Sequence, residues 1–318
     1  MTSKAHITTV NYQDFISNDS ERKLDFITNL GKSFAEIGFV AVSNHGVTAA
    51  LRYELYSASR KFFELPDQVK AKYEFPELAG QRGYIGKFKE TAKDSKNPDM
   101  KEFYHVGQQN QESIDLDYPI NIWPEEVPEL KDISIRIYQI FEEIGQTLLQ
   151  AIALYLNLSE KFFDQKIYLG NSILRLLHYF PVEDISDIPE GSVRAAAHED
   201  INLITLLMGA SAEGLQVKTK TGQWINVNPL ANQIVVNIGD MLQRLTNGRL
   251  LSTSHRVINK NPLLMKKSRY SIPFFLHPIP SMDLSALPNT INENQPKKFK
   301  DITAGVYLEE RIKELGLR

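Results

Sequence analysis

The chain has 318 residues, of which 42% are hydrophobic and 24% charged, so it is long enough to bury a substantial core without disulfides. Its 36 basic and 39 acidic residues leave a net charge of −3, and no overall basic field would attract nucleic acid or anionic lipid. The absence of cysteine excludes disulfides, thiolate metal ligands and cysteine nucleophiles, so a metal ion would need histidine, carboxylate or other oxygen and nitrogen ligands.

The N-terminal part of the chain predicts two helices with a short strand between them. Apolar residues recur at helical spacing over 24–37 and again over 51–62, and the second helix is expected to end before Pro66. The apolar run 39–42 is typical of a strand and is followed by turn residues. Residues 76–124 are rich in Gly, Pro, Lys and Asn, which predicts irregular structure.

A long amphipathic helix is predicted next, because apolar residues over 133–155 are spaced along one stripe. After about residue 170, short β-type runs alternate with turn residues, which is typical of an all-β sandwich or barrel. These runs are 172–179, 203–208, 215–218, 233–238, 250–257 and 270–276. A short amphipathic helix over 306–315 follows, and helices in front of a β core predict an α+β fold.

Two histidines in the β-rich part stand among polar residues that could form a metal site. His198 and Asp200 are two positions apart, so their side chains would share one face of a strand. His255, in the next polar segment, could supply a third ligand. Two histidines and one carboxylate bind non-haem Fe(II) on one face and leave three positions open. Taken alone, however, the short His-x-Asp pattern is explained better by chance.

A second polar pattern precedes the apolar run 272–275. Arg269 and Ser271 would also share a face of a strand, and an arginine planted in an apolar strand requires an anionic partner. Its guanidinium fits a carboxylate bidentately, and a serine hydroxyl adds a donor. Taken alone, this pattern is explained better by an arginine at a sheet edge whose head extends into solvent.

Motifs that occur together in one enzyme family follow one another over nearly the whole chain. In the N-terminal part they are 38–47 (GFVAVSNHGV), 62–66 (FFELP) with Lys70, 82–84 (RGY) and 99–102 (DMKE). In the C-terminal part they are 174–181 (LRLLHYFP), 198–207, 214–217, 222–229, 237–248 and 252–257. The sequence therefore resembles the iron- and 2-oxoglutarate-dependent oxygenases of the isopenicillin N synthase-like superfamily.

This resemblance implies a distorted double-stranded β-helix, or jelly roll, flanked by helices that include the long central one. It implies a single integrated unit with four parts. These are an N-terminal helical and mixed region (1–125), the long bracing helix (126–165), the jelly-roll core (166–285) and a C-terminal tail with a helix (286–318).

The resemblance also implies a set of site residues. His198, Asp200 and His255 correspond to the Fe(II) ligands. 2-Oxoglutarate would chelate the iron, and its distal carboxylate would pair with Arg269 and Ser271, with Tyr179 as a third contact. One departure is Leu177, where many relatives have asparagine. The implied cofactors and co-substrates are Fe(II), 2-oxoglutarate and O2, with ascorbate as a stimulant.

Substrate contacts are expected from the N-terminal loops and the mouth of the barrel. The six residues predicted there are Tyr84, Phe103, Tyr104, Ile201, Gln243 and Phe275. Glu199, between two implied ligands, is expected to point to the opposite face of its strand and make no contact with iron. His178 and Arg256 are interpreted as structural.

The predicted reaction is hydroxylation of a small organic metabolite, coupled to decarboxylation of 2-oxoglutarate to succinate and CO2; desaturation and ring closure are variants. One alternative is an isopenicillin N synthase-like oxidase that uses no 2-oxoglutarate and whose Arg-x-Ser pair holds the substrate's carboxylate. Another is a non-catalytic ligand-binding relative, against which the complete ligand set argues. No motif identifies the substrate.

The expected partner is a small-molecule substrate, without nucleic acid, membrane or an obligate protein partner. The beginning of the sequence contains no apolar run typical of a signal peptide, and no segment approaches the roughly 18 apolar residues of a membrane span. We therefore expect a cytoplasmic protein.

Overall fold

The computed structural model describes residues 7–90, 98–109, 118–182, 193–209, 214–228, 230–258 and 262–314. Pro229, which belongs to one of the motifs, and Leu315, expected at the end of the last helix, lie outside these residues. Within the described part of the chain, no helix is both long enough and apolar enough to cross a membrane.

Two N-terminal helices begin at residues whose side chains cap them. Helix α2 (Ser20–Glu36) follows Asp19, whose carboxylate accepts hydrogen bonds from two backbone N–H groups of the first turn. Helix α3 (Ala49–Phe63) follows Thr48, whose side chain accepts one such bond. The described residues also form α1 (Tyr12–Ile16), α4 (Asp67–Lys70), α5 (Glu129–Tyr155), α6 (Asp164–Ile167), α7 (Asp240–Leu245), α8 (Pro262–Met265) and α9 (Ala304–Glu314).

An eight-stranded sheet forms the larger half of the β core, with the strand order β1-β2-β10-β7-β12-β5-β4-β3. Its strands are β1 (Thr9–Asn11), β2 (Phe39–Ser43), β3 (Gly83–Ile85), β4 (Glu102–Gly107), β5 (Ile173–Tyr179), β7 (Ile204–Met208), β10 (Ile234–Ile238) and β12 (Arg269–Leu276). Neighbouring strands are antiparallel except β1 and β2, which are parallel. Strands from the N-terminal region thus form both edges of the sheet.

A four-stranded antiparallel sheet packs against one face of the larger sheet. It has the order β6-β11-β8-β9 and consists of β6 (Ala195–His198), β8 (Leu215–Lys218), β9 (Trp224–Asn226) and β11 (His255–Val257). Phe103 and Tyr179 of the larger sheet belong to the same buried cluster as Val217 and Val257 of the smaller one. The expected jelly-roll core and the α+β fold class are therefore confirmed.

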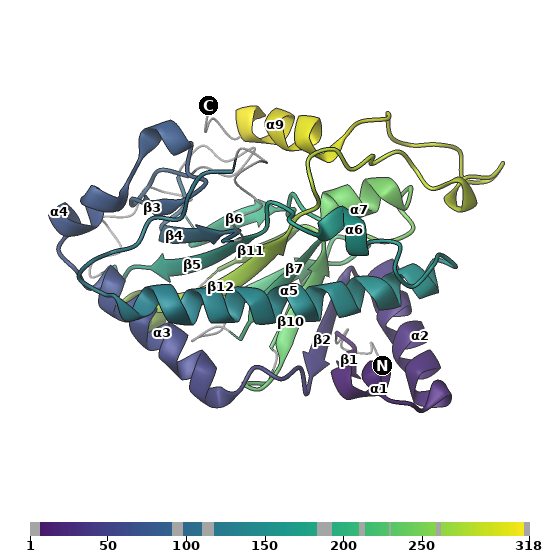
Figure 1. Cartoon of the computed structure of the whole chain (residues 1–318), viewed down its shortest axis with the longest axis horizontal. Helices are drawn as coiled ribbons and strands as arrows, with labels where there is room; N and C mark the ends of the chain where they lie inside the picture. The colour runs from purple at the N-terminus through teal and green to yellow at the C-terminus, as the bar shows by residue number, and fades with distance from the viewer. Residues whose placement is uncertain are drawn as a thin grey trace.

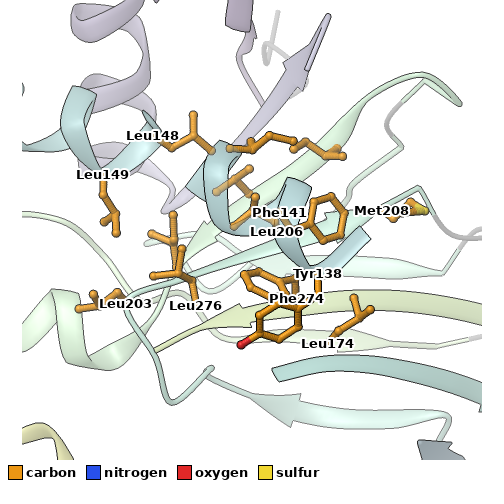
Figure 2. Close-up of a cluster of buried hydrophobic side chains, with 14 of the residues drawn as sticks. Tyr138, Phe141, Leu148, Leu149, Leu174, Leu203, Leu206, Met208, Phe274 and Leu276 are labelled. Atoms are coloured by element: carbon orange, nitrogen blue, oxygen red, sulfur yellow. The ribbon is translucent and has the colours of Figure 1, made fainter. Parts of the chain in front are cut away.

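Helix α5 runs across the opposite face of the larger sheet (Figure 1). The rings of Tyr138 and Phe141 lie 5.0 and 5.7 Å from the ring of Phe274, measured between centroids, and Figure 2 shows them together above the sheet. The helix can approach this closely at Gly145, where a Cβ atom would lie 2.2 Å from Cδ1 of Leu276. The predicted long helix is therefore confirmed as the brace of the sheet.

Replacement of Phe274 by alanine is expected to destabilise the protein by about 3–5 kcal/mol, because it leaves a cavity under α5. Urea unfolding followed by circular dichroism measures this loss. Tyr53→Ala is the matched control, since Tyr53 is 75% exposed on α3 and its removal should cost less than about 0.5 kcal/mol. Equal losses in both variants would contradict the assignment of Phe274 to the core.

Several elements differ from the sequence prediction. The segment 76–124, expected to be irregular, contains β3 and the fully buried β4. The sequence also fails to predict β6, β9 and α7, and in the run 250–257 only the last three residues form a named strand. Strand β6 has the sequence Ala195-Ala196-Ala197-His198, which has little intrinsic β propensity, so its pairing with β11 depends on tertiary contacts.

Candidate active site

Three side chains with metal-binding atoms come together where β6 and β11 pair. His255 stands directly opposite His198 in the antiparallel register, and Asp200 follows β6. Oδ1 of Asp200 lies 3.8 Å from Nε2 of His198 and 3.7 Å from Nε2 of His255. One ligand atom from each residue lies within 4.8 Å of the other two, which is close enough for all three to bind one ion.

Hydrogen bonds orient all three groups toward this common point. Nδ1 of His198 lies 2.8 Å from the carbonyl oxygen of Ala196, and Nδ1 of His255 lies 3.1 Å from that of Thr253. Because a carbonyl only accepts, each Nδ1 carries the proton and each Nε2 keeps a lone pair for a metal.

The carboxylate is oriented in the same way. Oδ2 of Asp200 accepts hydrogen bonds from the hydroxyl of Thr205 at 2.6 Å and the amide of Asn237 at 2.8 Å. Oδ1 is then the oxygen that faces the two imidazoles. The donor set is therefore two nitrogens and one oxygen, which fits the facial coordination of non-haem Fe(II).

The electrostatic environment favours the protonation states that a divalent cation needs. Burial, together with the neighbouring His255, lowers the pKa of His198 to about 4, so this imidazole is neutral at pH 7. Burial by itself raises the pKa of Asp200, but the two histidines and the hydrogen bonds to its carboxylate lower that pKa overall. Asp200 is therefore ionised, and little proton release opposes metal binding.

A second buried polar group lies between the two sheets. Arg269 and Tyr179 face each other across β12 and β5, with the guanidinium carbon 4.9 Å from the centre of the tyrosine ring. Arg269 is 1% exposed, and β12 is an interior strand between β5 and β7. The alternative of an arginine at a sheet edge in contact with solvent is therefore wrong. Ser271 is also buried on β12.

Arg194 adds a second buried cation at this place, and the sequence does not predict it. Its guanidinium carbon lies 5.9 Å from the Tyr179 ring, and its Nη2 donates to the carbonyl oxygens of Leu264 and Lys267. Burial and the nearby Arg269 lower the pKa of Arg194 to about 10, which still leaves it protonated at neutral pH. Two buried cations around one tyrosine make this region attractive to an anion.

A cavity of about 620 Å³ opens beside the metal-binding side chains, and His198 and Asp200 form part of its wall. Three of the six predicted substrate contacts, Ile201, Gln243 and Phe275, line this cavity. Glu199, which was expected to point to the opposite face of its strand, lines this cavity together with His198 and Asp200. Helix α9 contributes Tyr307, whose hydroxyl donates to Asp240 at 2.7 Å.

The other three predicted substrate contacts do not line this cavity, and a role for them in substrate binding stays a prediction. Tyr84 and Tyr104 project from the face of the larger sheet that the helices cover, and their rings pack against Phe62 of α3. Phe103 faces the interior between the sheets, where the guanidinium of Arg175 covers its ring at 4.2 Å. Side chains alternate along a strand, so neighbours in β4 face opposite sides.

Instead, a cluster of charged residues forms one side of the cavity. Nζ of Lys101 lies 2.7 Å from Oδ2 of Asp99 and 3.3 Å from Oε2 of Glu90. Nη1 of Arg175 lies 3.3 Å from the same Glu90 oxygen, and its Nε donates to Nε2 of His105. Asp99 and Lys101 lie in the DMKE motif, which was the available sequence signal, but their place at the cavity depends on the fold.

His178, interpreted from the sequence as structural, lies on the helix-covered side of β5. Its Nδ1 is 2.7 Å from Oε1 of Glu102, and Nζ of Lys70 lies 2.7 Å from the other oxygen of that carboxylate. Lys70 and Glu102, both from the family motifs, thus form a buried ion pair on the helix-covered side of β4, whereas Lys101, directly before β4, lines the cavity.

Comparisons with known proteins agree with this arrangement. Residues 7–126 match the family described as non-haem dioxygenase in morphine synthesis, N-terminal, and residues 170–278 match the 2OG-Fe(II) oxygenase superfamily. A 2OG-Fe(II) oxygenase family protein of Caulobacter crescentus is 37% identical, with 97% of this chain and 98% of that chain covered at a TM-score of 0.85. The chain belongs to the 2OG-Fe(II) oxygenase superfamily.

Two further relatives of this oxygenase are similar over almost their full lengths. The proline hydroxylase buaE of Petromyces alliaceus is 31% identical, with 96% of this chain and 98% of the relative covered. A protein of Neurospora crassa, solved at full length in complex with alpha-KG, is 30% identical, with 98% and 97% covered at a TM-score of 0.86. Another structure of this Neurospora crassa protein contains both alpha-KG and thymine.

The family predicted from the sequence is thus confirmed, and the protein is an oxygenase that depends on Fe(II), 2-oxoglutarate and O2. These relatives favour 2-oxoglutarate-dependent hydroxylation over the cyclase and the non-catalytic alternatives.

Proposed function

We propose that His198, Asp200 and His255 hold the Fe(II) ion of this oxygenase. The observation that carries this assignment is the convergence of two histidine Nε2 atoms and one carboxylate oxygen, beside a cavity that His198 and Asp200 line. When bound, the iron supplies, together with O2 and 2-oxoglutarate, the oxidant that attacks a C–H bond. The residues of the chain hold the ion on one face and leave the cavity side open.

We further propose that Arg269, Ser271 and Tyr179 bind the distal carboxylate of 2-oxoglutarate. Arg269 offers a planar fork of donors that fits a carboxylate, and burial between the sheets strengthens such a pair because water is excluded. Arg194 supports the same assignment, since a second cation nearby increases the attraction for a dianion. The guanidinium carbons of Arg269 and Arg194 lie 4.9 and 5.9 Å from the centre of the Tyr179 ring, so Tyr179 is placed to contact the bound anion as well.

For the substrate, we propose a small organic molecule without net charge. Lys101 and Arg175 at the cavity wall pair with Asp99 and Glu90, so their charges balance one another. Phe275 and Ile201 add apolar surface near the metal-binding side chains. Thymine, which is bound in one structure of the Neurospora crassa relative, is a member of this class and supports it.

A turnover screen tests this proposal. The protein is incubated with Fe(II), 2-oxoglutarate and O2 in the presence of uncharged heterocycles, including thymine, and of charged metabolites of similar size. We expect succinate formation to rise with an uncharged compound, and ¹⁸O2 to place one label in succinate and one in the hydroxylated product. Stimulation by charged compounds alone would contradict the proposed substrate class.

A further inference from the structure

Strand β6, which ends at the proposed ligand His198, lies at the edge of its sheet. Its ladder partner is β11, and this pairing is irregular between His255 and Val257. The opposite edge of β6 is covered by the segment around Asp99. Oδ1 of Asp99 accepts a hydrogen bond from the backbone N–H of Ala196 at 3.0 Å, and the N–H of Met100 donates to the carbonyl oxygen of Val193 at 3.3 Å. The segment thus replaces a neighbouring strand.

The residue that Asp99 contacts is also the one that orients His198. The N–H of Ala196 donates to Asp99, and the carbonyl oxygen of Ala196 accepts the Nδ1–H of His198 at 2.8 Å. A shift or rotation of the backbone at Ala196 would therefore turn the imidazole. His198 is also the most exposed of the three proposed ligands, with 36% of its side chain exposed, against 10% for His255 and 6% for Asp200.

Asp99 is itself held firmly in place. It is 3% exposed, its Oδ2 lies 2.7 Å from Nζ of Lys101, and its N–H donates to the carbonyl oxygen of Glu90 at 3.0 Å. The Glu90 carboxylate contacts both Lys101 and Arg175, each at 3.3 Å. A buried ion pair contributes to stability only weakly, but its fixed geometry suits it to hold a group in one position.

We propose that Asp99 is a positioning residue for His198, acting through the backbone of Ala196, and that Lys101 fixes the Asp99 carboxylate. The inference rests on the proposed metal site. In this proposal, the DMKE segment fixes the orientation of the His198 imidazole and so the direction of its Nε2 lone pair. The affinity for the metal should then depend on Asp99, although Asp99 does not contact the metal.

Metal binding without turnover tests this inference. The affinity for Mn²⁺ is measured under anaerobic conditions, with the free ion quantified by electron paramagnetic resonance. We expect Asp99→Ala to raise the Kd for Mn²⁺ about tenfold, which is within the range known for residues that orient metal ligands. Asp99→Asn should stay within about threefold of the wild type, because its Oδ1 can still accept from Ala196.

Lys70→Met is the matched control for the loss of a buried ion pair. Lys70 pairs with Glu102 on the other face of β4, away from β6, so this variant should lower the Tm but leave the Kd for Mn²⁺ unchanged. A Kd that rises equally in Lys70→Met and Asp99→Ala would mean that general destabilisation is responsible, and it would overturn the proposal.

Proton NMR of the Co²⁺-loaded protein gives a second readout, which remains available if Asp99→Ala does not fold. The ring N–H protons of the coordinating histidines are shifted by the paramagnetic ion. In Asp99→Asn we expect the Nδ1–H of His198 to exchange faster with solvent or to shift, because the asparagine still accepts from Ala196 but loses the ion pair with Lys101 that fixes its position. The signal of His255 is the internal reference and should not move. Unchanged signals for both histidines would overturn the proposal.

His198→Ala separates this inference from the assignment of the metal site. If this variant binds Mn²⁺ as the wild type does, then His198 is not a ligand and the proposed site itself fails. If His198→Ala loses the ion but Asp99→Ala binds it normally, the metal site stands and the role of Asp99 is refuted.

Discussion

Replacement of Asp200 by alanine is expected to abolish turnover and to raise the Kd for Mn²⁺ by more than about 100-fold. Asp200 supplies the only charge among the three proposed ligands, since histidine binds a metal as the neutral imidazole. Its removal leaves two neutral nitrogens for a divalent cation. It also leaves the hydroxyl of Thr205 and the amide of Asn237 without their common acceptor. The loss should therefore exceed the roughly 10–100-fold effects of residues that merely orient a ligand.

Anaerobic Mn²⁺ binding and succinate release measure these two effects. Asp301→Ala is the matched control, because the Asp301 carboxylate pairs with Lys297 at the surface and should leave both quantities unchanged. Normal Mn²⁺ binding by the folded Asp200→Ala variant would remove Asp200 from the metal site.

Replacement of Arg269 by alanine is expected to raise the KM for 2-oxoglutarate about 100-fold while the metal affinity stays close to that of the wild type. The buried guanidinium is the proposed partner of the distal carboxylate, and loss of one member of a buried ion pair costs about 3 kcal/mol or more. A loss of this size corresponds to a factor of about 100 or more in affinity. Arg269→Lys should recover part of the loss, because lysine keeps the charge but not the bidentate geometry.

The KM for 2-oxoglutarate is obtained from succinate formation, and calorimetry on the Mn²⁺-loaded protein gives the affinity directly. Arg249→Ala is the matched control, since Arg249 stacks on Tyr155 of α5 and does not line the cavity. A normal KM in Arg269→Ala would show that the cosubstrate carboxylate is bound elsewhere, with Arg194 as the next residue to test.

The prediction from sequence was most accurate where a local residue pattern by itself determines the secondary structure and its buried face. The stripe of apolar residues along α5 predicts the face that packs on the sheet, because helical periodicity is a local property. The order of the motifs identified the family, and this resemblance implied His198, Asp200, His255 and Arg269 as site residues. Local patterns alone left both the His-x-Asp pair and the Arg-x-Ser pair open to simpler explanations.

Local patterns could not predict which residues near β3 and β4 line the cavity, because this depends on the face of the strand that each residue occupies. Tyr84 and Tyr104 were assigned to the pocket, but both pack under α3, whereas Lys101 and Arg175 reach the cavity. A register change of one residue in β4 would move Tyr104 to the opposite face of the sheet. Composition over 76–124 gave no indication of a strand, so it could not give the register.

This cysteine-free sequence of 318 residues therefore determined by itself the fold class, the family and the chemical type of the ligands, because these follow from local patterns and from the order of motifs. Tertiary structure decided how those residues are supported and what surrounds them. The Asp99 carboxylate reaches β6 across about a hundred residues of chain, and two arginines flank Tyr179 from different segments. Such contacts are made only when the two sheets pack together, and no local pattern encodes them.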